Sequence, residues 1–137
     1  MTESPNQAAD ETTAPAVDTH LEILLRLVEA QPDARMAICL TTPGGIIGGH
    51  LVAARSWAER WEDAVRESGV TQQAAPMAQL PQMVQAAQPH GDASDRGLHR
   101  FLHLVDVTFM SVPGAPTSSV WRGRVSDVCG WSLGAPS

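Results

Sequence analysis

The chain has 137 residues, of which 43% are hydrophobic and 18% charged, and a net charge of −6. This length suits a single domain with a packed core, and the acidic balance disfavours non-specific nucleic-acid binding, which needs a surplus of positive charge. No apolar run approaches the ~18 residues of a membrane span, and no signal peptide pattern opens the chain, so we expect a soluble, cytoplasmic protein.

The chain begins with a polar segment and continues into a helix. Residues 1–18 are rich in Thr, Ser, Pro and acidic residues, which predicts a disordered tail ahead of a single domain over residues 19–137. Thr19 and Glu22 have the spacing of a capping box that starts a helix. Pro32 ends it. The apolar stripe of this helix consists of Leu21, Leu24, Leu25 and Val28.

Two strands and a second helix follow. Alternating apolar residues predict strands over residues 35–42 and 46–54, joined by a tight turn at Gly44-Gly45. Gly48 and Gly49 inside the second strand predict a bulge or a sharp bend. A capping box at Ser56 and Glu59 starts the helix, whose apolar face consists of Trp57, Trp61, Ala64 and Val65.

Residues 70–97 differ in composition from the segments on either side, because they combine six Gln with scattered Ala, Met and Pro. A short helix around Leu80 to Ala87 is one alternative, but we favour a flexible insertion, since long segments of this kind are usually functional or disordered. Met side chains adapt to varied apolar surfaces. The segment is therefore our candidate for partner contact, through Met77, Leu80, Met83 and Val84.

Three further strands complete the expected fold, over residues 98–110, 119–125 and 128–133. The resulting class is α+β: an N-terminal helix and a bent five-stranded antiparallel sheet or small barrel, with a helix and a long loop between strands 2 and 3. Alternation along the strands predicts a buried core of Met36, Ile38, Leu40, Leu51, Leu102, Leu104, Val125 and Leu133.

The sequence shows no pattern that is typical of a catalytic, phosphate-binding or metal site. No Lys is present to contact a phosphate, and His99 and His103 would lie roughly 13 Å apart on a strand, too far for one ion. Asp106 interrupts an apolar run, and we interpret it as a strand-end residue that bonds backbone amides at a bend. Cys39 and Cys129 are expected to be buried, inert thiols. We predict no enzyme, no cofactor and no metal.

Several segments carry a family resemblance. They are ICLT at residues 38–41, GIIGGHLVAARSW at 45–57, FLHLVDV at 101–107 and VWRGRVSDVCGWSLG at 120–134. Together they resemble the gas vesicle accessory protein U family (GvpU). The resemblance implies a non-enzymatic accessory protein that associates with gas vesicles or their proteins and affects assembly or clustering. The vesicle surface is one place where such a protein could act. The motif residues are Gly49, Trp57, His103, Asp106, Trp121, Arg122, Gly123, Gly130, Trp131, Leu133 and Gly134.

A more distant resemblance links the chain to Sm-like small β-barrels. Two segments would take the places of that fold's third-strand and fourth-strand motifs, namely residues 104–107 (LVDV) and the Arg122-Gly123 pair. The alternative function is thus an Sm-like RNA-binding regulator, although Phe101 stands where RNA-binding members have Asn, and a Phe can stack on a base without reading its edge. Pairing between edge strands predicts self-association through residues 120–133. We expect the basic residues Arg100, Arg122 and Arg124 to pair with Asp106 and Asp127.

Overall fold

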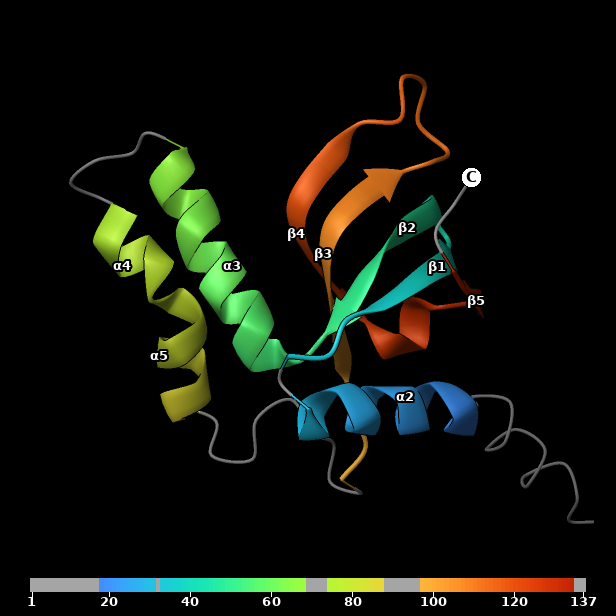
Figure 1. Ribbon diagram of the computed structural model, residues 1–137, viewed down its shortest axis with the longest axis horizontal. Helices are drawn as coiled ribbons and strands as arrows, with labels where there is room; N and C mark the ends of the chain where they lie inside the picture. Colours follow the sequence, from blue (N-terminus) through green and yellow to red (C-terminus); the bar gives the residue numbers. More distant parts are fainter. Residues whose placement is uncertain (1–17, 32, 69–73, 88–96, 135–137) are drawn as a thin grey trace, which may run out of the picture.

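A computed structural model describes residues 18–31, 33–68, 74–87 and 97–134. The elements, labelled in Figure 1, are helix α2 (Thr19–Ala30), strands β1 (Met36–Thr42) and β2 (Gly45–Val52), helices α3 (Ala54–Glu67), α4 (Ala74–Ala78) and α5 (Leu80–Ala87), strands β3 (Phe101–Phe109) and β4 (Thr117–Arg124), the 3-10 turn η1 (Val125–Asp127) and strand β5 (Gly130–Leu133). The expected tail over residues 1–18 lies outside the described residues except for Asp18.

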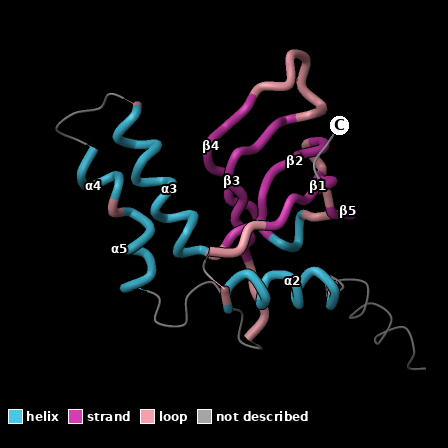
Figure 2. Tube along the Cα trace, in the orientation of Figure 1, coloured by secondary structure: helices cyan, strands magenta, loops and turns pink. Residues whose placement is uncertain are grey.

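The five strands form one antiparallel sheet in the order β4-β3-β2-β1-β5. The sheet is open, with β4 and β5 as its edges, so the α+β prediction is confirmed and a closed barrel does not form. Figure 2 shows the strands grouped on one side of the molecule and helices α3, α4 and α5 on the other. The two-residue turn between β1 and β2 is Pro43-Gly44, one residue earlier than expected, because Thr42 pairs with Gly45.

A bulge in the middle of the sheet decides which residues face the core. The register between β2 and β3 shifts between Gly48 and His50, where the two glycines predicted an irregularity. The extra residue lies on β3 rather than on β2, because Asp106 and Val107 together lie opposite Gly49, and Asp106 has a positive φ of 52°. A Cβ on Gly49 would lie 3.2 Å from the Val105 carbonyl oxygen and from the Val107 side chain. The extra residue lets Leu104 and Val107 both enter the main core, while Val105 packs with Trp57 on the α3 side.

The main core lies between α2 and the sheet. Its members include Leu21, Leu25 and Val28 of α2, together with Ile38, Leu40, Leu51, Leu102, Leu104 and Val107 of the strands. Five of the eight predicted core residues are therefore fully buried. Met36 and Val125 are half-buried against the same cluster. Leu133 is 57% exposed, so its prediction was wrong; it lies at the end of β5, the four-residue edge strand.

Both predicted capping boxes were wrong, although the helices themselves formed. The N-cap of α2 is Asp18, whose carboxylate accepts from the Leu21 backbone N–H at 3.0 Å. The N-cap of α3 is Ala53, which has no side-chain cap. Instead, Glu29 of α2 accepts a hydrogen bond from the Ala54 backbone N–H at 3.0 Å, which satisfies one of the first free amides of α3.

The predicted insertion contains two helices rather than a loop. Helices α4 and α5 occupy residues 74–87, so the loop assignment was wrong there, and the weak apolar periodicity of residues 80–87 was the better guide. Residues 70–73 and 88–96 lie outside the described part of the chain. In Figure 1, α4 and α5 lie beside α3, away from the sheet's β1 and β5 edge.

Candidate functional site

The four residues that we expected to contact a partner come together on α4 and α5. Met77 is 48% exposed, Leu80 49%, Met83 60% and Val84 38%. On α5, the spacing of Leu80, Met83 and Val84 places them on neighbouring turns of one helical face. The structure therefore presents an apolar surface, here called the α4–α5 face, defined by Met77, Leu80, Met83 and Val84.

Trp61 attaches this face to the rest of the domain. Its indole N–H donates to the Met77 backbone carbonyl at 2.7 Å, and its ring stacks on Trp57 with centroids 5.6 Å apart. Ala78 and Val65 are both buried, and Trp61 packs against them. The tryptophan face of α3 thus packs inward, as its helical spacing predicted, and also supports α4.

The motif residues on β3 and β4 form a second group, next to α3. His103 is 5% exposed, and its ring lies 5.2 Å from that of Trp57. Arg122 donates from Nε to His103 Nε2 at 3.2 Å, and its guanidinium carbon lies 3.7 Å from the centre of the Phe101 ring. One face of Phe101 is therefore covered by Arg122, which occupies the position that a stacked base would need.

Asp106 binds two arginines, not the backbone amides that we had expected. Its carboxylate accepts from Arg60 of α3 at 2.7 Å and from Arg35, just before β1, at 2.6 Å. The hydrogen bond from Arg60 is the main cause that holds the pKa of Asp106 below its ordinary value, and Arg35 adds to it against the opposing effect of burial. The expected pairing of Asp106 with arginines of β4 was wrong, but Arg124 does pair with Asp127 at 3.0 Å.

The C-terminal motif residues have structural partners. Trp131 packs against the main core and donates from its indole N–H to Asp18 at 2.8 Å, which fixes β5 to the start of α2. Gly134 donates its backbone N–H to the Ala37 carbonyl at 2.8 Å. A Cβ on Gly123 would lie 2.2 Å from the Trp121 ring, so Gly123 leaves space for a ring that packs on the core. Gly130 pairs with Thr41 across the sheet, whereas Leu133 is exposed.

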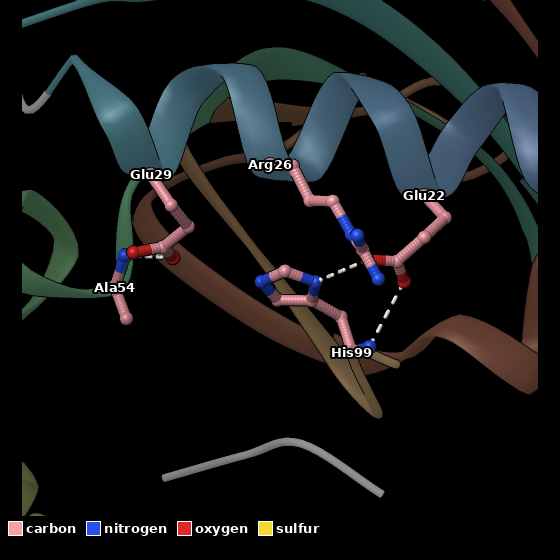
Figure 3. Close-up of polar contacts among 5 residues, drawn as sticks. All are labelled: Glu22, Arg26, Glu29, Ala54 and His99. Carbon is pink, nitrogen blue, oxygen red and sulfur yellow. Dashed lines mark hydrogen bonds and ion pairs between the residues drawn. The ribbon is translucent and has the colours of Figure 1, made fainter. Parts of the chain in front are cut away.

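Two glutamates of α2 act as a clamp that the sequence analysis missed (Figure 3). Buried Glu22 accepts from the His99 backbone N–H at 2.9 Å, contacts His99 Nδ1 at 2.7 Å and accepts from Arg26 at 2.8 Å. Burial raises the pKa of Glu22, but these hydrogen bonds outweigh it and lower the pKa below its ordinary value. Glu29, seven residues later, holds Ala54. Through these bonds, α2 holds Ala54 and His99, the residues immediately before and after residues 55–98.

The described residues contain no group of three or more His, Cys, Asp or Glu side chains that could hold a metal ion. None of the described helices is both long and apolar enough to cross a membrane. Cys39 is half-buried and Cys129 exposed, and both are free thiols, so the expectation that both are buried was wrong for Cys129.

Comparison with known proteins identifies the family. The profile of the family described as gas vesicle protein GvpU-like matches residues 18–136, nearly the whole chain. Searches of curated proteins and of solved structures give no significant match. The matched region includes the α2 clamp, the whole sheet and the α4–α5 face. The chain therefore belongs to the GvpU-like family of gas vesicle accessory proteins.

Proposed function

We propose that this chain is a non-enzymatic accessory protein of the cytoplasm that binds the surface of gas vesicles, or their proteins, and affects vesicle assembly or clustering. The observation that carries the proposal is the α4–α5 face, where four large apolar side chains are between 38% and 60% exposed. Contiguous exposed apolar surface typically marks a site of contact with another macromolecule. Family membership supplies the gas vesicle context.

The composition of the α4–α5 face suits weak and repeated contacts. Met77 and Met83 have flexible, polarisable side chains that can pack on apolar surfaces of different shape. The helices α4 and α5 carry no charged residue in their sequences AAPMA and LPQMVQAA, so no ionic contact competes with apolar packing there. Several such weak contacts on one particle would add up to firm binding.

Self-association would bring several copies of the α4–α5 face together in one oligomer. β4 and β5 are the edges of an open sheet, and each has one side of its backbone unpaired by another strand of the sheet. Unpaired edges are natural sites for strand pairing between chains. We therefore expect the chain to oligomerise through residues 120–133. Analytical ultracentrifugation at micromolar concentration tests this, and a pure monomer would contradict it.

Flotation of purified vesicles tests the binding surface. Gas-filled particles rise on centrifugation and separate from free protein, so bound chain is recovered with the vesicles. The test variant is Met77→Ser/Met83→Ser, and the matched control is Ile23→Ser/Leu27→Ser, because Ile23 and Leu27 of α2 are also about half exposed, at 50% and 51%. We expect the first variant to lose binding at least tenfold and the control to keep it.

Two results would overturn the proposal. One is unchanged vesicle binding by Met77→Ser/Met83→Ser when circular dichroism shows an intact fold. The other is tight binding of single-stranded RNA without any vesicle binding, which would support the Sm-like regulator instead.

A further inference from the structure

An open pocket lies between the β1–β2 turn and the end of β4, on the far side of the molecule from α4 and α5 (Figure 1). Its volume is about 340 Å³, more than twice the about 150 Å³ of a cavity that holds one benzene ring. The described residues that line it include Thr42, Pro43, Gly44, Trp121, Arg124 and Asp127. The pocket shares no described lining residue with the α4–α5 face.

The polar side chains of this pocket are already hydrogen-bonded within the chain, with one exception. The Arg124 guanidinium donates to both carboxylate oxygens of Asp127, at 3.0 and 3.5 Å, so the pair carries no net charge. The Thr42 hydroxyl is likewise bonded within the β1–β2 turn. The indole N–H of Trp121 has no acceptor among the described residues and, unlike that of Trp57, is not buried. The pocket therefore suits an uncharged, apolar group that brings one hydrogen-bond acceptor.

The loop between β3 and β4, residues 110–116, presents a group of this kind. Its sequence, MSVPGAP, has no charged residue, all of its residues are exposed, and it extends beyond the sheet (Figure 1). At its tip the Ala115 backbone N–H donates to the Val112 carbonyl at 2.9 Å, and Gly114 has a φ of 84°. Together with Pro113, this is the pattern of a type II turn. No described backbone N–H donates to the Pro113 carbonyl, so this oxygen is available as an acceptor.

The loop is fixed at its base, next to the turn that borders the pocket. The Met110 backbone N–H donates to the Ile46 carbonyl at 2.9 Å, and the Ile46 N–H donates to the Ser111 hydroxyl at 2.8 Å. A tip that is already ordered loses little conformational entropy when it binds. None of the described residues that line the pocket comes from the loop of the same chain. Because the loop and the pocket lie at one end of the sheet, two copies related by a two-fold axis can exchange tips.

We propose that the chain forms a dimer in which the loop tip of each copy, residues 112–115, enters the pocket of the other copy. The Pro113 ring packs on the Trp121 ring, and the Pro113 carbonyl accepts from the Trp121 indole N–H. The loop of a second copy is the occupant because it supplies the two features that the pocket lacks, an uncharged apolar group and a free acceptor. The two contacts form together, so each strengthens the other. This inference rests neither on vesicle binding nor on pairing between the β4 and β5 edges.

Two charged substitutions test the contact from both sides. Gly44→Glu places a carboxylate at the pocket, and the fold tolerates it because Gly44 is exposed and a Cβ there would meet only the Thr42 hydroxyl, at 3.8 Å. Pro113→Lys places a positive charge at the tip. Each variant alone should weaken dimerisation at least tenfold, because a charge must enter an uncharged contact. The equimolar mixture should recover to within threefold of the natural chain, since a Lys tip then meets a Glu pocket and the second contact is natural.

Sedimentation equilibrium measures the dimer, and the ¹⁵N-labelled indole signal of Trp121 on dilution measures occupancy of the pocket. For the natural chain we expect a Kd of about 100 μM, because the contact is small. The matched control is a mixture of Gly44→Lys with Pro113→Lys, which should not recover because both charges are positive.

Three results would overturn the proposal. The first is a pure monomer, with an unchanging Trp121 signal, at concentrations well above that Kd. The second is association that Gly44→Glu and Pro113→Lys both retain in full, which would assign it to pairing of the β4 and β5 edges alone. The third is equal recovery in the Glu–Lys mixture and in the Lys–Lys control.

Discussion

Replacing Glu22 by Gln tests the clamp that α2 forms on the start of β3. The carboxylate side chain is only 8% exposed and makes three contacts, two of them with His99. Gln keeps the size of the side chain but loses the charge, and its amide nitrogen cannot accept a hydrogen bond. Because a hydrogen bond to a charged group contributes about 1.5–3 kcal/mol and Gln retains part of the network, we expect the free energy of unfolding to fall by about 2 kcal/mol at pH 7.

The pH dependence of this loss has a definite sign. The pKa of Glu22 in the folded chain lies below its ordinary value of 4.5, so the ionised carboxylate stabilises the fold above pH 4.5. That contribution disappears as the pH falls through the lowered pKa and the carboxylate becomes protonated. The stability difference between the natural chain and Glu22→Gln should therefore be largest near neutral pH and shrink below pH 4.5.

Urea unfolding followed by tryptophan fluorescence at pH 7 and at pH 3.5 measures both effects. The matched control is Glu62→Gln, because Glu62 also pairs with an arginine four residues later but its side chain is 31% exposed. An exposed pair of this kind contributes only about 0.3–0.5 kcal/mol. The reasoning would be refuted if Glu22→Gln destabilised the chain no more than Glu62→Gln, or if its cost were the same at both pH values.

Five further substitutions at four positions test the sheet and its bulge, each by the same unfolding assay. Leu104→Ala should lower the free energy of unfolding by about 2–5 kcal/mol because Leu104 is fully buried, whereas Leu133→Ala at the exposed end of β5 should cost less than about 1 kcal/mol. Gly49→Ala should cost about 1–3 kcal/mol, since the new Cβ would crowd the Val105 carbonyl and the Val107 side chain, and a neutral effect would contradict that close approach. Asp106→Asn should lower the free energy of unfolding by less than about 1 kcal/mol, because the lost ion pairs are exposed and Asn tolerates the positive φ. Asp106→Val should cost clearly more, because a β-branched residue does not tolerate a positive φ. Equal effects of the two substitutions would count against backbone strain at the bulge.

Local patterns were enough to predict the sheet. Alternation located all five strands within a few residues, because this signal depends only on neighbours in the chain. Gly48-Gly49 marked the place of the register shift, although the extra residue lies on the facing strand β3. The exposure of Leu133 could not be predicted, since it follows from the pairing of β5 at the sheet's edge. Of the helices between β2 and β3, α3 was predicted, α5 was given only as an alternative and α4 was missed. Two proline residues and several glutamines weaken the periodicity of residues 74–87, and contact with Trp61 stabilises this segment.

Long-range polar contacts could not be predicted from spacing. Glu22 looked like a capping residue three positions after Thr19, yet its main partner, His99, is 77 residues away. Likewise, the carboxylate of Asp106 meets Arg35 and Arg60 only because the sheet brings three separate segments together. The available signal for Glu22 was its position three residues before Leu25, on the side of α2 that is buried, because an unpaired charge at such a position would be unfavourable.

The central claim is that this chain brings gas vesicles together through the α4–α5 face, and dynamic light scattering on purified vesicles tests it most directly. Adding the natural chain should increase the mean particle size, and Ile23→Ser/Leu27→Ser should do the same. Met77→Ser/Met83→Ser, with its fold intact, should leave the vesicles dispersed. An unchanged particle size with the natural chain, or equal clustering by the Met77→Ser/Met83→Ser variant, would contradict the claim.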